Sequence, residues 1–315
     1  MKKNQFYLLF IILLLWAKAL HAREQISRNM FMVTNLNTEN GLSSSRVYSI
    51  VEAEDGAMWI STKRGVDRYN GQVVTNYTLA TEMQYSDASG RTIKLLQDCN
   101  RQLYAYDNKG KVYIYNKDQD AFILKYNLLN LLGRSTVLNE LLVDSKGNFW
   151  LALDHGLYWL QASVDEKEIS QEKAKGKYIL KNIYINHIQF VGQKLLVGTS
   201  KDVYQYSLVS LKMEKKLNGF SVVSSYHDRV AHQIWLGTFH QGVLVLDDRT
   251  WNPVSMVDFG SLSKIPQIPV RSIIPYKNDA LLMAVDGAGI YAFDRVSKQT
   301  HLILDTEGRP GSVLK

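Results

Sequence analysis

The feature that most constrains the fold is a unit of about 45 residues that recurs along the chain. Its clearest copy, "EDGAMWISTKRGVDRYNG" at residues 54–71, holds two turns and two short apolar runs. The copies align on an apolar anchor residue, and by subtraction the anchors are 44, 47, 46, 39 and 47 residues apart: Trp59, Leu103, Trp150, Leu196, Trp235 and Leu282. A hairpin of this size cannot bury its own apolar face, so each copy needs neighbours.

Each copy contains four short apolar runs without a 3.6-residue period, which favours strands over helices. Turn glycines recur between the second and third runs: Gly65, Gly110, Gly156, Gly242 and Gly289. Four short strands per repeat of this length are typical of a β-propeller blade. The sequence therefore predicts an all-β propeller of six complete four-stranded blades, with the Trp anchors packed between blades. The predicted blades cover about 46–79, 91–127, 136–182, 183–217, 219–259 and 268–305.

The two ends of the repeat array resemble each other. Residues 30–45 match residues 301–315, and both contain an outer strand, a Thr-Glu turn and a lead-in to the next inner strand. Residues 31–36 are therefore predicted to be an orphan outer strand of an incomplete seventh blade, and 306–315 the start of the next repeat. Either six blades close with this extra strand, or the chain is part of a longer ring; we favour the longer ring.

The first 22 residues have the order of a secretory signal peptide. Lys2 and Lys3 precede an apolar run at 6–16, and small residues end at Ala22. The run is short for a bilayer span, so we expect cleavage and a periplasmic protein, with an uncleaved inner-membrane anchor at 6–16 as the alternative. Residues 23–315 are then the propeller.

Composition excludes several classes of function. The net charge of +7 falls to +4 without residues 1–22, which carry three Lys and no acid, and the surplus is spread along the chain. Such a mild, dispersed charge is not a nucleic-acid footprint. Cys99 is the only cysteine, so no internal disulfide is expected. The sequence shows no membrane-length apolar stretch after the signal peptide, and no cofactor is expected.

The unit at 40–71 resembles the repeat of the two-component regulator propeller family. Its Gly-Leu-Ser-Ser motif falls at 41–44, and its later positions fall on Gly56, Trp59, Gly65 and Tyr69. The resemblance implies a periplasmic sensor region of a Bacteroidetes hybrid two-component protein that responds to glycan fragments. The family's transmembrane helix and histidine kinase have no counterpart here, so the resemblance implies a truncated N-terminal sensor portion without catalysis.

In an antiparallel blade, the turns between second and third strands all lie on one face of the ring. Propellers often bind ligands on such a face, and basic or imidazole side chains can hydrogen-bond sugar hydroxyls. We therefore predict an oligosaccharide site there, and a homodimer through faces or edges as a second form of partnership. The candidate ligand-binding residues are Arg64, Lys109, His155, Lys201 and His240.

Two alternatives remain open: a secreted propeller enzyme of glycosidase or lyase type, and a stand-alone interaction scaffold. A glycosidase needs two facing carboxylates, and the inner-strand acids show no repeated pairing. His227 and His232 lie in a turn on the face opposite His155 and His240, so no metal site is expected. His187 is expected to be an interior residue with its polar atoms satisfied. No nucleophile–base arrangement is visible, so no catalytic residue is predicted.

Overall fold

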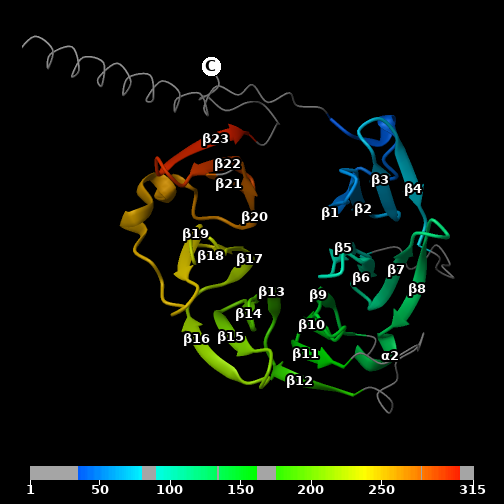
Figure 1. Ribbon diagram of the computed structural model, residues 1–315, viewed down its shortest axis with the longest axis horizontal. Helices are drawn as coiled ribbons and strands as arrows, with labels where there is room; N and C mark the ends of the chain where they lie inside the picture. The colour runs from blue at the N-terminus through cyan, green and yellow to red at the C-terminus, as the bar shows by residue number, and fades with distance from the viewer. Residues whose placement is uncertain (1–34, 80–89, 133–134, 162–174, 278, 306–315) are drawn as a thin grey trace, which may run out of the picture.

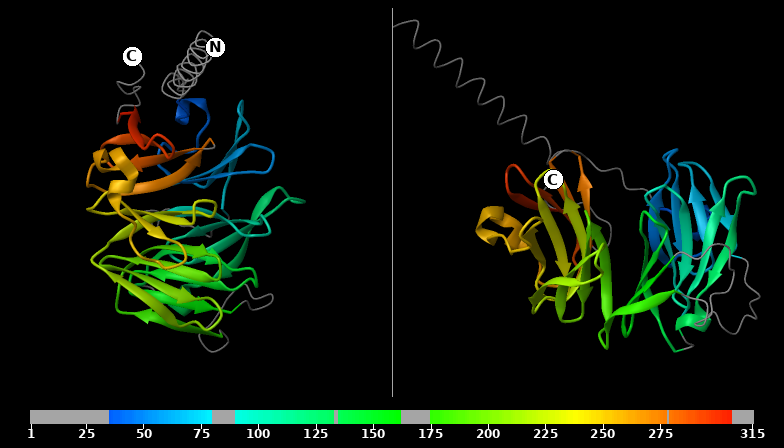
Figure 2. Two further views of the ribbon diagram at one scale, coloured as in Figure 1. Left: turned by 60° about the vertical axis from the view of Figure 1, so that its left-hand side comes forward. Right: turned by 60° about the horizontal axis from the view of Figure 1, so that its bottom comes forward.

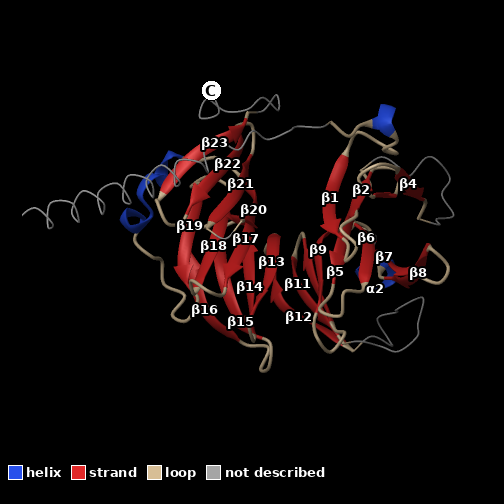
Figure 3. Cartoon of the chain, turned by 45° about the horizontal axis from the view of Figure 1, so that its top comes forward, coloured by secondary structure: helices blue, strands red, loops and turns tan. Residues whose placement is uncertain are grey.

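The computed structural model describes residues 35–79, 90–132, 135–161, 175–277 and 279–305. Within these ranges the strands form six antiparallel sheets that follow one another around a ring (Figure 1). Each sheet takes its strands from one continuous stretch of the chain, in sequence order from the inside of the ring outwards. The predicted β-propeller fold is therefore confirmed. Figures 2 and 3 show the blades side by side, with the short helices at the periphery.

The strands are numbered in chain order, and each blade takes consecutive strands. Blade 1 contains β1 (Val47–Glu52), β2 (Met58–Thr62), β3 (Val66–Tyr69) and β4 (Val74–Tyr77). Blade 2 contains β5 (Ile93–Gln97), β6 (Leu103–Asp107), β7 (Lys111–Asn116) and β8 (Ala121–Asn127). Blade 3 contains β9 (Leu138–Val143), β10 (Phe149–Leu153), β11 (Gly156–Leu160) and β12 (Gly176–Lys181). Blade 4 contains β13 (Ile185–Val191), β14 (Lys194–Thr199), β15 (Asp202–Ser207) and β16 (Met213–Asn218). Blade 5 contains β17 (Val222–Asp228), β18 (Gln233–Thr238) and β19 (Val243–Asp247). Blade 6 contains β20 (Val270–Tyr276), β21 (Ala280–Val285), β22 (Gly289–Asp294) and β23 (Gln299–Leu304). The short helices are η2 (Thr38–Asn40), α2 (Leu129–Leu132) and η4 (Met256–Lys264).

Apolar side chains pack between neighbouring blades in five clusters, one for each contact from blades 1–2 to blades 5–6. Trp59 lies in the first of these contacts, Trp150 in the third and Trp235 in the fifth. None of the three is more than 5% exposed. The core of the protein therefore lies between sheets, and the predicted packing role of the Trp anchors is correct.

The side of the ring between blade 6 and blade 1 differs from the other five contacts. Among the described residues, no apolar cluster contains members of both blades. Strand β10 of blade 3 is buried along its whole length. By contrast, Ile50 and Met58 of blade 1 are 58% and 38% exposed, and Ile274 of blade 6 is 51% exposed. Each terminal blade thus keeps one partly uncovered face, and these faces flank the open side of the ring (Figure 1).

Blade 5 requires a correction, because its predicted outer strand at 254–259 does not form. An isolated bridge pairs Leu246 with Pro253, and the chain then enters η4. Proline has no N–H for a ladder, and the apolar residues that follow are spaced by three, as in a 3₁₀ turn. This spacing lets Phe259, Leu262 and Ile265 all enter the cluster between blades 5 and 6.

Several predictions fall outside the described residues. These are the signal peptide at 1–22, most of the orphan strand at 31–36 and the segment 306–315. Asn35 and Leu36 are described and carry no strand. In the part of the chain that the structure describes, no helix is long and apolar enough to cross a membrane.

Candidate functional site

The five candidate side chains lie on turns between the second and third strands of blades 1 to 5, one per blade. All are exposed except His155, which is half-buried. Both of its ring nitrogens are occupied, by Asp154 Oδ1 and by the Tyr178 hydroxyl, each at 2.7 Å. No hydrogen bond or ion pair joins any two of the five described side chains, which are spread around the ring. Their role in ligand binding stays a prediction.

A repeated threonine shapes these turns. The buried Thr199 hydroxyl donates to Asp202 O at 2.8 Å and accepts from Asp202 N at 2.9 Å. In blade 5, Thr238 Oγ1 donates to Gly242 O at 2.9 Å and accepts from Gln241 N at 2.8 Å. A side chain that hydrogen-bonds to the backbone groups of a turn in this way stabilises the turn conformation.

In blade 1, Thr62 is also reached by the Gly-Leu-Ser-Ser motif. The Ser43 hydroxyl lies 2.7 Å from Thr62 Oγ1 and 2.9 Å from Asp67 Oδ2, and Ser43 N donates to the same carboxylate at 2.9 Å. Asp67 is fully buried, so these bonds compensate for its desolvation. The motif therefore ties the lead-in segment to the second and third strands of its own blade.

The opposite face of the ring holds a cavity of about 710 Å³ between blades 1 and 2. Its walls come from the β1–β2 turn of blade 1 and from the β5–β6 and β7–β8 turns of blade 2. Trp59 from β2 and Tyr115 from β7 line it, with ring centroids 4.7 Å apart. Asp120 accepts hydrogen bonds from the Tyr115 hydroxyl at 2.6 Å and from the Tyr77 hydroxyl at 2.8 Å, so the aromatic wall is held in place.

Five of the six charged residues that the structure describes around this cavity form ion pairs. Arg68 forms an ion pair with Asp55, and its guanidinium carbon lies 5.6 Å from the centre of the Trp59 ring. Glu54 lies 3.4 Å from Arg101 and 3.9 Å from Lys117. With Asp118, the described residues that line the cavity include three acids and three bases. The cavity is therefore neutral as a whole, and its ion pairs are exposed to solvent.

A second polar cluster lies on the inner strands of blades 3, 4 and 5. His187 Nδ1 is 3.0 Å from Glu140 Oε2, and His187 Nε2 is 2.7 Å from Ser225 Oγ. Glu140 also accepts from Ile188 N at 2.8 Å. Burial tends to raise the pKa of Glu140, but the nearby His187, Lys94 and the Ile188 N–H outweigh it and lower this pKa.

His187 is thus a satisfied interior residue, as predicted, with a side chain only 15% exposed. The sequence alone did not single out the chain of contacts that joins Ser225, His187 and Glu140, in which the Ser225 hydroxyl also donates to Gln189 Oε1. The absence of a catalytic residue stays a prediction. The signal was present in the repeat. These residues precede the anchors Trp150, Leu196 and Trp235 by ten, nine and ten residues, so they hold nearly equivalent positions on adjacent inner strands.

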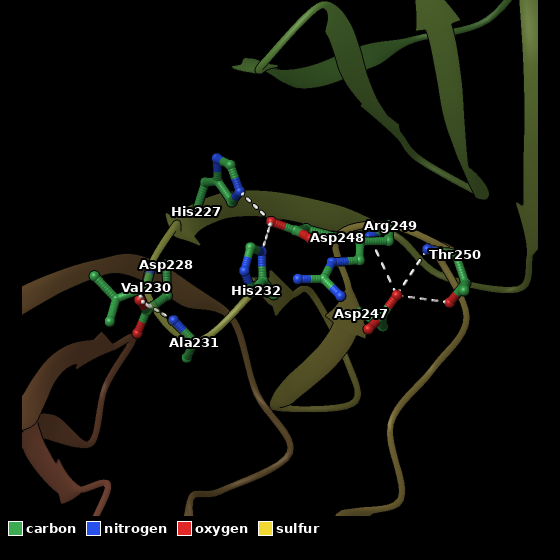
Figure 4. Close-up of polar contacts among 9 residues, drawn as sticks. All are labelled: His227, Asp228, Val230, Ala231, His232, Asp247, Asp248, Arg249 and Thr250. Carbon is green, nitrogen blue, oxygen red and sulfur yellow. Dashed lines mark hydrogen bonds and ion pairs between the residues drawn. The ribbon is translucent and has the colours of Figure 1, made fainter.

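The two histidines of blade 5 meet at one carboxylate (Figure 4). His227 Nε2 lies 2.9 Å and His232 Nδ1 lies 3.4 Å from the same oxygen of Asp248. Asp248 N also donates to His232 O at 3.0 Å. The contacts tie the β17–β18 turn to the end of β19. Over the described ranges, no group of three or more His, Cys, Asp or Glu residues has a geometry that suits a metal ion.

Comparisons with known proteins agree with the fold and with its first repeat. Residues 41–64 match the family model described as two component regulator propeller, which confirms the resemblance carried by that repeat. No curated protein matches the sequence. The chain is similar to the extracellular domain of a B. thetaiotaomicron protein assigned as a hybrid two component system, with 18% identity and a TM-score of 0.65. This similarity covers 87% of the chain and 37% of that solved domain.

The chain is also similar to PorZ, described as a bacterial surface component of the type-IX secretion system of Porphyromonas gingivalis. The identity is 10%, the TM-score is 0.58, and the similarity covers 83% of this chain and 39% of PorZ. At these identities the similarity shows the fold alone. In both cases the chain spans well under half of the solved protein's length.

Proposed function

We propose that this chain is the ligand-binding propeller of an exported sensor of the hybrid two-component type, and that its ligands are glycan fragments. The observation that carries the proposal is the match of residues 41–64 to the two component regulator propeller model. The structural similarity to an extracellular domain of such a system supports it. Residues 1–22 would direct export to the periplasm, and this chain would bind ligand without catalysis.

The proposal is tested by unfolding the purified chain in the presence of glycan digests. A ligand present at about 100 times its Kd raises the free energy of unfolding by about 2.7 kcal/mol, which scanning fluorimetry detects as a higher Tm. The expected result is a rise with some digests and none with amino acids or nucleotides. A Tm that no glycan digest changes would contradict glycan sensing.

We further propose that a seventh blade fills the open side of the ring, with 31–36 as its outer strand and its inner strands encoded beyond residue 315. The support is the partly uncovered apolar face of each terminal blade, at Ile50 of blade 1 and Ile274 of blade 6. In a longer chain, Ile274→Asp should lower stability markedly, and in the present chain it should have little effect. Equal effects in both chains would refute the blade. A change in oligomeric state of the present chain alone would instead indicate that a second copy covers these faces.

A second candidate function, acyl transfer, is favoured by the Ser225–His187–Glu140 geometry. Glu140 accepts the Nδ1–H of His187. The Ser225 hydroxyl donates to Gln189 Oε1, so its single proton would have to turn from Gln189 to His187 Nε2 before the imidazole could take it. Ser225 Oγ would attack an ester carbonyl, the departing alcohol would take the proton from His187, and water would release the acid. A fluorophosphonate probe should then label wild type but not Ser225→Ala or His187→Gln. An unlabelled wild type refutes this candidate and leaves the cluster as a tie between three blades.

A further inference from the structure

The cavity between blades 1 and 2 has the size of a small-ligand site. Its volume of about 710 Å³ lies within the range of roughly 300–1,000 Å³ that such sites occupy. It is formed by turns of two blades, and it lies on the face opposite the basic turn residues that the sequence singled out. Any ligand held here would contact neither Lys201 nor His240.

The charge of the cavity disfavours an anionic ligand. Three acids and three bases are among the described residues that line it, and Arg68, Arg101 and Lys117 each have a carboxylate partner. An anionic ligand would have to displace Asp55 or Glu54 from one of these bases and would add negative charge near Asp118. A neutral ligand leaves the pairs intact and can hydrogen-bond to their free lone pairs and N–H groups.

The wall chemistry selects for a ligand with both apolar and hydroxyl surfaces. Tyr115 supplies aromatic surface, with Trp59 packed behind it and only 5% exposed. The electron-rich face of such a ring attracts polarised C–H groups. Gln97 and Gln102 supply amides that are already oriented, because their NH₂ groups donate to Arg101 O at 3.2 Å and to Tyr115 O at 2.9 Å. Each of these amides keeps a carbonyl oxygen as an acceptor.

From these contacts we infer that the cavity between blades 1 and 2 binds an uncharged oligosaccharide. A sugar ring lies against the Tyr115 side of the aromatic wall, and its hydroxyls bond to Gln97, Gln102 and Asn100. The site is held in place before the ligand binds, since Asp120 fixes Tyr115 and the Asp98 carboxylate accepts from Asn100 N and Gln102 N at 2.9 Å each. The inference rests on the proposed glycan-binding function and names its site and ligand class.

The test is calorimetric titration of the full chain with cellohexaose, xylohexaose, mannohexaose and galacturonic acid hexamer. Asn100 is exposed, so Asn100→Trp places bulk at the mouth of the cavity without removing a buried contact. Lys201→Trp places the same bulk on an exposed turn of the opposite face and is the matched control. We expect at least one neutral hexamer to bind, and Asn100→Trp to weaken it by about tenfold or more, with Lys201→Trp unchanged.

The outcomes separate the site, the ligand class and the proposed function. Binding that Asn100→Trp leaves intact and Lys201→Trp weakens would place the ligand on the basic turn face and refute this site. Binding of the galacturonic acid hexamer alone would refute the neutral ligand class. In both of these cases glycan binding itself would stand. A wild-type chain that binds none of these sugars or the digests above would refute the proposed function and the inference together.

Discussion

Replacing Trp235 by Ala is predicted to destabilise the propeller by about 3 kcal/mol. The side chain is fully buried between blades 5 and 6, with ring centroids 5.2 Å from Phe259 and 5.5 Å from Phe293. Truncating a buried Trp typically costs about 3–5 kcal/mol. No group among the described residues accepts a hydrogen bond from Trp235 Nε1. Removing the indole therefore also removes the cost of about 1 kcal/mol of burying this N–H without a partner. The expected loss is therefore near the lower end of the range.

Trp150 supplies the matched comparison. It is equally buried, but its Nε1 donates to Asp144 Oδ2 at 3.3 Å. Trp150→Phe breaks this bond, whereas Trp235→Phe breaks none, so Trp150→Phe should cost about 1 kcal/mol more. Urea unfolding followed by far-ultraviolet circular dichroism measures both, with the slope m compared between variants. A loss below about 1 kcal/mol for Trp235→Ala would refute the packing argument, and a Trp150→Phe variant as stable as Trp235→Phe would refute the hydrogen-bond term.

Three further predictions concern other contacts of the ring. Glu140→Gln should lower stability at neutral pH, because the folded pKa of Glu140 lies below its usual 4.5 and the ionised carboxylate therefore stabilises the fold. The difference in unfolding midpoint between wild type and Glu140→Gln should shrink as the pH falls below 4.5, measured by unfolding at a series of acidic pH values. Gly65→Ala should destabilise by about 1–3 kcal/mol, since its new Cβ would lie 2.4 Å from Tyr77 O; Gly156→Ala should behave alike in thermal melts, because the same distance separates it from Leu180 O. Asp120→Ala should weaken neutral-sugar binding by more than Asp118→Ala in the calorimetric titration, because it releases both Tyr115 and Tyr77.

The fold could be predicted from sequence because each blade is a local object. The strands of one blade are consecutive, their turns carry glycine or Asp, and the anchors recur at a nearly constant period. Blade 5 shows where this logic ends. The run at 254–259 has enough apolar residues for a strand, but Pro253 and the left-handed backbone of Gly260, with φ 54°, favour a helical turn instead. The apolar pattern therefore predicts that Phe259 is buried, but it does not determine whether the backbone forms a strand or a 3₁₀ helix.

The two polar sites were missed for different physical reasons. The Ser225–His187–Glu140 chain joins nearly equivalent repeat positions, so it is visible once the inner strands are compared column by column. The cavity has no such signal. Its walls combine the first turn of blade 1 with two turns of blade 2, and its neutrality depends on which exposed charges pair across that boundary. The sequence identifies basic residues at the turn tips, but it does not show which charged residues form ion pairs across a blade boundary.

Blade 1 connects the two unusual regions of the ring. Its strand β2 places Trp59 in the cavity toward blade 2 and the adjacent Met58 on the opposite face, toward the open side of the ring. Successive side chains of a strand point to opposite faces, so a ligand beside Trp59 and a sheet covering Met58 would act on the same short strand. If each changes the position of β2, their binding free energies are coupled, and the coupling must be equal in both directions. The affinity of the cavity for sugar should therefore be compared in the present chain and in a longer one whose ring is closed, since equal affinities would show that β2 does not transmit between its two faces.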